Sequence, residues 1–403
     1  MSTTETKSLK IMMTGGGTGG HIMPVLAVAH EFKQLRPDAL ITYVGQIGDS
    51  LGDIPERDKN INRIINVRAG KFRRYHGEGW RRLIDFEALY KNLQDLIWIM
   101  VGFWQSFWLL GKEQPDVIFT RGSYVSVPVC WAAALRRIPY ITHDSDAIPS
   151  LANRLIAPWA KVHAVAFPKE VYTTYAAEKT VTVGVPISHN FHAVSAAEES
   201  VWRKQLGLES AGKVLFVTGG GRGADRLNKA LMKCAPELLV RYPDLVIVHV
   251  TGRELEAGAR KGYKQLLSTQ ELKRVVVKGF VTNLHQYSGV ADVVLTRAGM
   301  TSLSEFAVQG KACVVVPNPQ LTGGHQSKNA KVLADRKAIR IVKEENLKHD
   351  AHALMPALVD LFDSPDMVKI LGARLSEFAQ PNAAHLLAVV LLEVAEGKPF
   401  TAS

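Results

Sequence analysis

Two glycine-rich segments constrain this chain more than any other feature. The first, residues 14–21, reads TGGGTGGH and follows an apolar run at 9–13. The second, residues 218–224, reads TGGGRGA and follows an apolar run at 214–217. Glycines let the backbone approach a ligand closely, and the N–H groups and dipole of a following helix favour a phosphate. Two such loops predict an α/β protein with two Rossmann-like domains that face each other across a cleft.

The composition fits this prediction. The chain has 403 residues, 47% of them hydrophobic and 22% charged, which is enough for two domains of about 150 to 200 residues. Cys130, Cys234 and Cys313 lie far apart without metal-ligand spacing, which is typical of reduced thiols in the cytoplasm. Residues 1–10 lack the pattern of a secretory signal. We therefore expect a cytoplasmic protein.

The positive charge is concentrated near one apolar segment. A formal net charge of +11 is compatible with nucleic acid, an anionic membrane or a phosphorylated substrate as partner. The apolar segment at 96–110 contains three tryptophans and is too short for a comfortable membrane span. Either a helix in the membrane interface or a core helix covering the sheet explains it. The basic residues that precede it are Lys71, Arg73, Arg74, Arg81 and Arg82.

Alternating strand and helix patterns divide the chain. Strands are predicted at 9–13, 40–44, 116–120, 140–142, 162–167 and 181–183, and again at 214–218, 245–251, 275–279, 293–296, 312–317 and 339–342. We predict a polar tail (1–10), an N-terminal acceptor and membrane domain (11–187), a linker (188–211) and a C-terminal donor domain (212–380). The last segment (381–403) contains a helix at 383–395 that can return to the first domain.

Two polar side chains next to helix starts are candidates for chemistry. His21 lies in the first turn after the first glycine loop, where it can act as a general base or bind a phosphate. Glu305 follows a predicted strand and lies three residues after Ser302, so the pair fits a capping box. A carboxylate at this edge of a parallel sheet can also accept both hydroxyls of a ribose.

Two further segments carry polar groups. His325, Gln326 and Asn329 fall within one helical turn after a glycine loop, and their neutral groups suit sugar hydroxyls. Asp144 and Asp146 follow a strand end and have the spacing of a divalent-metal site. Because two helix N-termini already favour a diphosphate, we expect no metal.

Along residues 10–395 the chain resembles the MurG family of peptidoglycan transferases, in glycosyltransferase family 28. The resemblance implies a GT-B fold and an inverting, metal-independent enzyme without a cofactor. It would transfer N-acetylglucosamine from UDP-N-acetylglucosamine to undecaprenyl-pyrophosphoryl muramylpentapeptide (lipid I), forming lipid II at the cytoplasmic face of the membrane. The motifs that carry it are GGTGGH at 16–21, GSYVS at 122–126, Gly219-Gly220 with Gly223-Ala224, Arg297-x-Gly299 with Ser304-Glu305, and His325-Gln326 with Asn329-Ala330.

The resemblance also implies roles for single residues. His21 faces the diphosphate and acceptor, Glu305 binds the ribose, and Gln326 binds the sugar. The remaining expected substrate-binding residues are Thr18, Gly19 and Gly20 beside the diphosphate, Phe280 and Val281 at the uracil, Met300, Thr301, Ser302, Leu303 and Ser304 at the phosphates, and Tyr124, Ser188, Gly221, Arg222, His325 and Asn329.

The chain departs from the family pattern on the acceptor and sugar side. Ser188 stands where the family usually has arginine, residues 143–146 read HDSD instead of His-Glu-Gln-Asn, and Gly221-Arg222 replaces Ser-Gln. Arg222 can restore a phosphate contact that Ser188 does not make. The donor nucleotide is therefore better specified than the acceptor.

The implied mechanism is attack of an acceptor hydroxyl on the anomeric carbon while a base takes its proton. His21 is the first candidate base, and Asp144 and Asp146 come next. At the membrane, Trp104 and Trp108 share a helix face at i, i+4 spacing and form the expected exposed pair, beside Arg73, Arg74, Arg81 and Arg82.

Three other functions remain open from the sequence. One is a glycolipid synthase of the same fold that transfers hexose to diacylglycerol. Another is a sugar-nucleotide epimerase, which has no reason to expose a tryptophan-rich segment. The third is a nucleotide-binding scaffold without activity, which the presence of His21, Glu305 and Gln326 argues against. No nucleic acid partner is expected.

Overall fold

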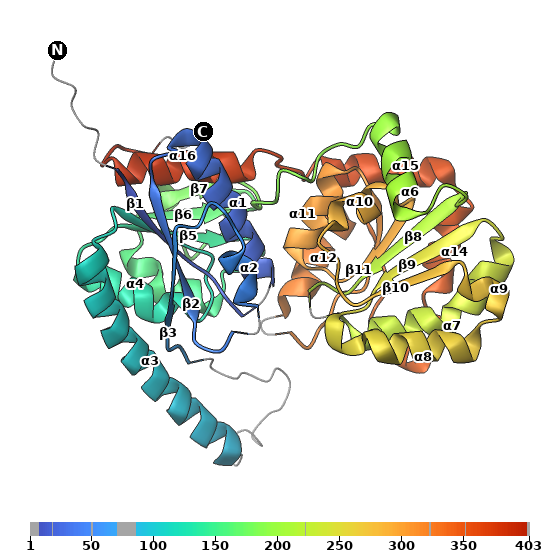
Figure 1. Ribbon diagram of the computed structural model, residues 1–403, viewed down its shortest axis with the longest axis horizontal. Helices are drawn as coiled ribbons and strands as arrows, with labels where there is room; N and C mark the ends of the chain where they lie inside the picture. The colour runs from blue at the N-terminus through green and yellow to red at the C-terminus, as the bar shows by residue number, and fades with distance from the viewer. Residues whose placement is uncertain are drawn as a thin grey trace. The chain divides into compact units, whose positions relative to one another are not determined.

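The computed structural model of the protein describes residues 8–17, 19–49, 51–70, 86–221, 223–321, 324–350 and 352–400. The chain divides into two compact units, Met1–Ser188 with Gln380–Ser403, and His189–Ala379. Each unit is built around one sheet in which neighbouring strands are parallel (Figure 1). This agrees with the βα alternation of the sequence.

The N-terminal unit has the strand order β3-β2-β1-β4-β5-β6-β7 in its described part. Its strands are β1 (Lys10–Thr14), β2 (Leu40–Gln46), β3 (Arg63–Val67), β4 (Val117–Thr120), β5 (Tyr140–Asp144), β6 (Val162–Val165) and β7 (Thr180–Thr182). The order reverses between β1 and β4. Open parallel sheets bind ligands outside the carboxyl ends of the strands at such a switch point.

Helices cover both faces of this sheet. They are α1 (Gly19–Leu35), α2 (Asp53–Glu56), α3 (Phe86–Glu113), α4 (Ser126–Leu135), α5 (Leu151–Ile156) and α16 (Ala383–Ala395), with short 3-10 turns η2 (Ala157–Trp159), η3 (Lys169–Val171) and η4 (Ala177–Lys179). Ile11 and Met13 of β1 pack with α1 and α16, whereas Met12 packs with α3 and α4 on the other face. Successive strand side chains point to opposite faces, so a fully apolar strand needs both layers.

The strand β3 is absent from the sequence prediction. Its residues read Arg-Ile-Ile-Asn-Val, and only Val67 is buried. It pairs with β2 alone because it lies at the edge of the sheet. An edge strand does not need the continuous apolar run by which the inner strands were predicted.

The C-terminal unit has the strand order β10-β9-β8-β11-β12-β13 among its described residues. Its strands are β8 (Lys213–Thr218), β9 (Leu245–Val250), β10 (Val275–Lys278), β11 (Val293–Thr296), β12 (Ala312–Val315) and β13 (Arg340–Ile341). The switch point lies between β8 and β11, and the second glycine loop follows β8.

The helices of this unit surround its sheet. They are α6 (Ala196–Leu206), α7 (Asp225–Arg241), α8 (Glu256–Leu266), α9 (Thr269–Leu272), α10 (Leu284–Gly289), α11 (Met300–Val308), α12 (His325–Asp335), α13 (Asn346–His349), α14 (Met355–Phe362) and α15 (Pro365–Ser376), with η5 (Arg253–Leu255). Residues 189–211, which the sequence assigns to a linker, are part of this unit and include α6. Ser195 and Glu198 form a capping box at its start, and Gly207 ends it in the left-handed region.

Candidate active site

The first glycine loop joins β1 to α1 at the switch point of the N-terminal sheet. Gly17 has a φ of 79°, and a Cβ there would lie 2.8 Å from the Tyr124 ring, so only glycine fits. Tyr124 comes from the segment after β4, the neighbouring strand, and its hydroxyl donates a hydrogen bond to Gln46 Oε1. The first glycine loop and Tyr124 therefore lie next to each other. Thr18 lies outside the described residues.

A carboxylate already contacts this loop. The Gly17 N–H donates to Asp49 Oδ2 at 2.7 Å, and the Leu51 N–H donates to Asp49 Oδ1 at 3.1 Å. The sequence analysis missed Asp49, although it follows the carboxyl end of β2, where ligand-facing residues gather. The Gly17 amide is thus occupied by an internal anion, and a bound diphosphate would have to use other groups of the loop.

His21 lies in the first turn of α1 together with Gly19 and Gly20. Gly20 is exposed and His21 is half-buried, so the imidazole remains within reach of solvent at the helix start. Helix starts favour negative charge on a ligand because their N–H groups have no partner within the helix. This placement is compatible with a base or a phosphate partner.

Asp144 is held in place by the protein. Its Oδ2 accepts from the Tyr175 hydroxyl at 2.6 Å and its Oδ1 accepts from the Ser150 N–H at 2.9 Å. Burial raises the pKa of this carboxyl to about 6. Both oxygens are engaged in fixing the loop after β5, which makes Asp144 better suited to positioning than to proton transfer.

The neighbours of Asp144 are also interlocked. His143 is buried, its Nε2 lies 2.8 Å from the Gly184 carbonyl oxygen, and burial followed by nearby Arg121 lowers its pKa to about 3. The Asn153 side chain donates to the His143 carbonyl at 2.9 Å.

The remaining predicted residues of this region are partly accessible. Asp146 is half-buried in the same loop, and Ser188 is half-buried at the end of the unit. Among the described residues, no three His, Cys, Asp or Glu side chains are grouped to hold a metal ion.

The second glycine loop has the geometry of a tight turn. Gly220 and Gly223 have φ of 85° and 75°, and the Gly223 N–H donates to the Gly220 carbonyl at 2.8 Å. A Cβ on Gly223 would collide with the Thr251 carbonyl at the end of β9. Gly221 is exposed, while Arg222 lies outside the described residues.

The start of α11 corrects one prediction. The helix begins at Met300 with Gly299 as a cap that has no side-chain hydrogen bond, so Ser302 and Glu305 do not form a capping box. The helix starts earlier than the box requires because Gly299 already turns the chain after β11. Thr301, Ser302, Leu303 and Ser304 belong to the first turns of α11.

The Glu305 side chain has no hydrogen bond or ion pair with any described residue, while its backbone carbonyl accepts from the Gln309 N–H at 3.4 Å. It is half-buried, and burial raises the pKa of its carboxyl to about 8. A carboxyl removed from water without a partner is unfavourable for folding unless another group compensates.

A buried ion pair fixes the backbone beside α11. Arg297 Nη2 donates to Glu344 Oε1 at 2.7 Å, and Arg297 Nη1 donates to the Val316 carbonyl at 3.0 Å. The arginine therefore ties the ends of β11 and β12 to the segment after β13. The sequence analysis used Arg297 as a motif residue but did not predict its partner.

Two amides of α12 have structural roles. Gln326 Oε1 accepts from the Asn318 N–H at 2.9 Å, and the Asn329 side chain donates to the Ala298 carbonyl at 3.3 Å. Both side chains are buried. These two side chains therefore hold the loops after β11 and β12. His325 is half-buried at the first turn of the helix.

Phe280 makes a cation–π contact that the sequence analysis did not predict. Its ring is 39% exposed, and the Arg253 guanidinium lies over it at 4.6 Å from the centroid. Arg253 follows β9 and Phe280 follows β10, so both lie at the carboxyl ends of neighbouring strands. Val281 is half-buried next to this pair.

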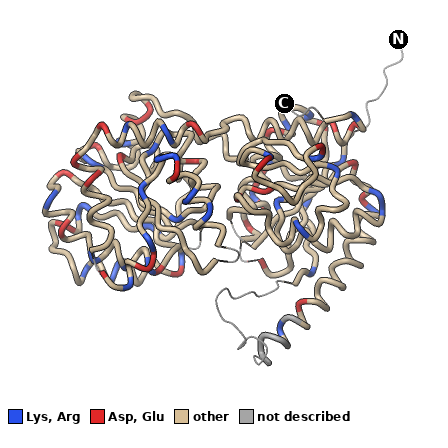
Figure 2. Tube along the Cα trace, turned by 180° about the vertical axis from the view of Figure 1, so that it is seen from behind, with Lys and Arg blue, Asp and Glu red and all other residues tan. Residues whose placement is uncertain are grey.

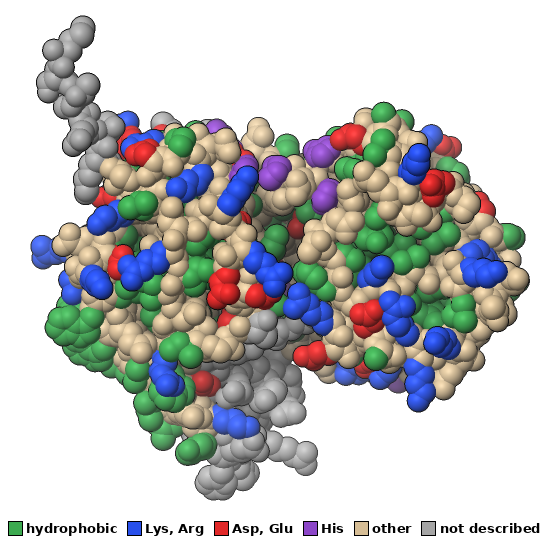
Figure 3. Space-filling view, in the orientation of Figure 1, with side chains coloured by type: hydrophobic (Ala, Val, Ile, Leu, Met, Phe, Trp, Pro, Cys, Tyr) green, Lys and Arg blue, Asp and Glu red, His purple; other side chains and the backbone are tan. Residues whose placement is uncertain are grey.

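A separate apolar surface lies on α3, away from the two loops in sequence. The helix carries no charge between Asp95 and Lys112, as the uncoloured trace in Figure 2 shows. Trp104 and Trp108 are 52% and 70% exposed, and Figure 3 shows hydrophobic side chains gathered over this helix. The other large exposed apolar residues of α3 are Tyr90, Leu93, Leu96, Ile97 and Met100.

We define the α3 surface as these seven exposed residues. The predicted basic residues beside it, Lys71, Arg73, Arg74, Arg81 and Arg82, lie outside the described residues. Trp98 is half-buried below the Arg68 guanidinium at 4.0 Å. No helix in the described part of the chain is both long and apolar enough to cross a membrane.

Two parallel α/β units, each with a glycine loop at its switch point, make up a GT-B fold. The family comparison agrees. The glycosyltransferase family 28 N-terminal domain matches residues 11–165, and its C-terminal domain matches residues 214–383. The chain belongs to glycosyltransferase family 28.

Similar proteins share nearly the whole chain. An enzyme of Natranaerobius thermophilus named UDP-N-acetylglucosamine–N-acetylmuramyl-(pentapeptide) pyrophosphoryl-undecaprenol N-acetylglucosamine transferase is 30% identical over 95% of this chain and 99% of its own. The enzyme of the same name in Bacillus subtilis is 29% identical over 96% of this chain and 99% of its own.

The solved structures agree on the fold. The crystal structure of MurG from Acinetobacter baumannii has a TM-score of 0.68 at 24% identity and covers 96% of this chain and 99% of its own. At this level of identity the likeness establishes the fold alone, and the family assignment comes from the sequence comparisons.

Proposed function

We propose that this enzyme transfers N-acetylglucosamine from UDP-N-acetylglucosamine to lipid I and so forms lipid II for peptidoglycan synthesis. The observation that carries the proposal is the end-to-end similarity to transferases named for this reaction, at 30% identity. The glycine loops at the two switch points and the Glu305 carboxyl without a protein partner also support the proposal. The alternatives of a glycolipid synthase or an epimerase have no comparable support along the sequence.

The donor is proposed to bind the C-terminal unit. Glu305 would accept hydrogen bonds from the two ribose hydroxyls, which would give its carboxyl the partner that it lacks. The uracil would lie near Phe280 and Val281, where Arg253 adds a planar cation. The N–H groups of Met300 to Ser302 would bind the diphosphate, since they open the α11 helix, whereas the Leu303 N–H already donates to the Gly299 carbonyl at 3.0 Å.

The donor sugar is proposed to contact the start of α12. Gln326 already accepts from Asn318, so its side-chain NH₂ is the group that would donate to a sugar oxygen. His325 would contribute from the same turn, and Gly221 with Arg222 would approach from the second loop. Asn329 would act by positioning the loop after β11.

The transfer itself would break one bond and form one. The acceptor C4 hydroxyl oxygen attacks the anomeric carbon, the bond between that carbon and the diphosphate oxygen breaks, and UDP leaves with the electron pair. His21 takes the hydroxyl proton, while helix N–H groups stabilise the leaving diphosphate. We propose that neither a metal nor a cofactor takes part.

The acceptor is proposed to meet the N-terminal unit at a membrane. A prenyl chain stays in the bilayer, so the enzyme must reach the cytoplasmic face of the membrane as a peripheral protein. The α3 surface would enter the headgroup region, with Arg73, Arg74, Arg81 and Arg82 attracting anionic lipid. Tyr124, Ser188 and residues 18–21 would border the acceptor.

Product analysis tests the proposed reaction. Purified protein would be incubated with lipid I and, separately, with diacylglycerol, each with a panel of UDP-sugars, and the products identified by mass spectrometry. We expect lipid II from UDP-N-acetylglucosamine and lipid I. A hexosyl-diacylglycerol product would favour the glycolipid synthase, and formation of a new UDP-sugar without acceptor would favour the epimerase.

A further inference from the structure

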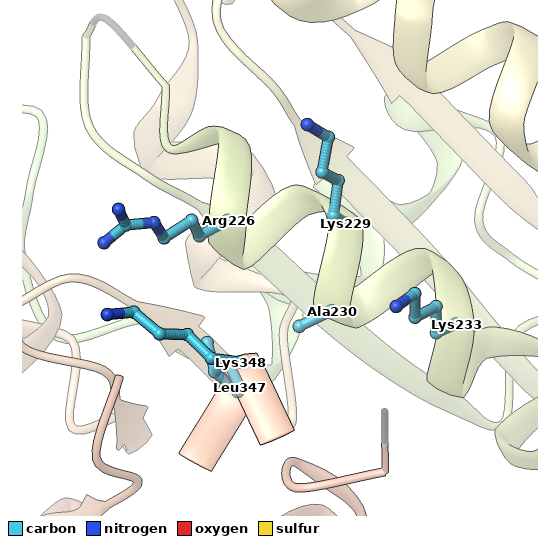
Figure 4. Close-up of a pocket in the computed structure, with 6 residues that line it drawn as sticks. All are labelled: Arg226, Lys229, Ala230, Lys233, Leu347 and Lys348. Carbon is cyan, nitrogen blue, oxygen red and sulfur yellow. The ribbon is translucent and has the colours of Figure 1, made fainter. Parts of the chain in front are cut away.

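A basic pocket lies on the outer side of α7 in the C-terminal unit. Arg226, Lys229 and Lys233 occupy positions i, i+3 and i+7 of α7 and therefore share one face of the helix. Lys348 joins them from α13. The pocket has a volume of about 170 Å³, and Figure 4 shows these four cationic side chains around it.

The floor of the pocket is apolar. It consists of Ala230, which is buried in the middle of the α7 face, and Leu347, which packs against the core from α13. The small Ala230 side chain leaves space between the cations that a longer residue would fill. A ligand that fits here is anionic and carries a small apolar part.

Two of the four cations pair with carboxylates of the described residues. Lys229 pairs with Asp225 at 2.8 Å. Arg226 lies 3.7 Å from Glu344, but that carboxylate also accepts from Arg297 at 2.7 Å. Lys233 and Lys348 form no ion pair with the part of the chain that the structure describes. Like charges held together repel, so an added anion stabilises this arrangement.

We propose that this pocket binds a phosphate group of a small organic phosphate or of a phospholipid headgroup. The flexible ammonium groups of Lys233 and Lys348 would contact the phosphate oxygens, and the Arg226 guanidinium would stay with Glu344. The site is distinct from Glu305 and the start of α11, and its existence does not depend on the proposed transfer reaction.

The pocket is connected to the loop before α12. Arg226 Nη1 lies within hydrogen-bond distance of Gln320 Oε1, at 3.3 Å, and Gln320 belongs to the segment between β12 and α12. Substituting Arg226 would therefore disturb that loop as well as the pocket. Lys233 and Lys348 are the better residues to test because they carry no such contact.

The experiment compares two double variants of the full-length protein. K233Q/K348Q removes two cations of the pocket, and K261Q/K264Q removes two exposed cations of α8 in the same unit. Glycerol 1-phosphate is titrated by calorimetry in saturating UDP, which fills the proposed donor site. In a second arm, binding to phosphatidylcholine vesicles with and without phosphatidylglycerol is measured by sedimentation.

We expect at least a 10-fold weaker interaction for K233Q/K348Q in one arm, with K261Q/K264Q close to the original protein. An effect on glycerol 1-phosphate identifies a soluble ligand, and an effect confined to phosphatidylglycerol vesicles identifies a headgroup. Equal behaviour of the two variants in both arms would overturn the proposal. Thermal unfolding of both variants controls for loss of structure, which these exposed positions should not cause.

Discussion

At the scale of single residues, Glu305 is the side chain that most directly reports donor binding. Glu305→Ala should weaken UDP binding by about 1.5 to 3 kcal/mol, because a charge-assisted hydrogen bond to the ribose is lost. Calorimetry with UDP measures this effect. Glu209→Ala removes an exposed carboxylate of the same unit and is the control. Unchanged UDP affinity in a folded Glu305→Ala protein would exclude the ribose role.

The same carboxyl should make stability depend on pH. Its pKa in the folded protein is raised to about 8, from an ordinary value of 4.5. Between about pH 4.5 and 8 the Glu305 carboxyl keeps its proton in the folded state and loses it in the unfolded state. The contribution of this carboxyl to stability is therefore full below pH 4.5 and declines as the pH rises to 8. Glu305→Gln should match the original protein at pH 4 and exceed its unfolding free energy by about 1 to 3 kcal/mol at pH 8. Calorimetric unfolding without ligand across this range checks the sign.

His21 should affect turnover more than binding. If its imidazole takes the acceptor proton, His21→Ala lowers kcat by about 10² to 10⁴-fold while UDP affinity stays the same. Steady-state kinetics with lipid I measures this. Asp144→Asn is the comparison, because a base role for Asp144 would instead concentrate the loss there. Near-normal turnover in His21→Ala would remove it as the base.

Asp49 should position the first glycine loop. Asp49→Ala removes the acceptor of the Gly17 N–H and should lower the unfolding free energy by about 1 kcal/mol. We also expect a higher KM for lipid I and an unchanged KM for UDP-N-acetylglucosamine, since the loop belongs to the N-terminal unit. Asp53→Ala, which breaks only a surface pair with Arg57, is the matched control. Equal kinetics for the two variants would contradict the positioning role.

These residues show what sequence alone can and cannot provide. The glycines and Glu305 were selected from local patterns. Glycines mark the loops that follow apolar strands, and polar residues mark the regions where helices begin. The Gly17–Asp49 contact joins residues 32 positions apart, and Arg253 meets Phe280 only when neighbouring strands are paired. Such partners depend on strand order and register, which residue patterns do not specify.

At the scale of elements, α3 is the helix whose exposed face most needs an explanation. Trp104→Glu/Trp108→Glu should reduce sedimentation with anionic vesicles at least 10-fold and reduce transfer to full-length lipid I. UDP binding and thermal stability should change little, because both side chains are more than half exposed. Vesicle sedimentation and unfolding curves together measure the two effects.

A tryptophan elsewhere in the same unit provides the control. Trp159 in η2 is 59% exposed, so Trp159→Glu introduces the same chemical change on another element. It should leave vesicle binding intact if α3 is the docking surface. Unfolding of the α3 double variant would instead show that this face is needed for packing.

The inner elements were easier to predict than the edges and helix starts. All strands other than β3 were expected within a few residues, because strands buried on both faces need continuous apolar runs. The helix α16 matches its predicted range of 383–395. The capping box at Ser302 was wrong because the helix is already capped at Gly299, three residues before the box would begin. The local sequence is compatible with either helix start.

At the scale of the whole molecule, both units use the same architecture for different proposed tasks. Each places a glycine loop after the first strand of its sheet, at a switch point. The last helix belongs to the first unit, and α16 packs with α1 there. A fold does not by itself specify a reaction, so the assignment as a transferase comes from the family comparison.

The response of the complete reaction to a chelator tests how the leaving diphosphate is stabilised. We expect the rate of lipid II formation to be the same in EDTA as in magnesium, because N–H groups at the start of α11 would supply the positive potential. The measurement is the initial rate with both substrates saturating, and a magnesium-dependent enzyme in the same buffers verifies chelation. A rate abolished by EDTA and restored by magnesium or manganese would contradict the metal-independent mechanism. In that case Asp144 and Asp146 would be the ligands to examine.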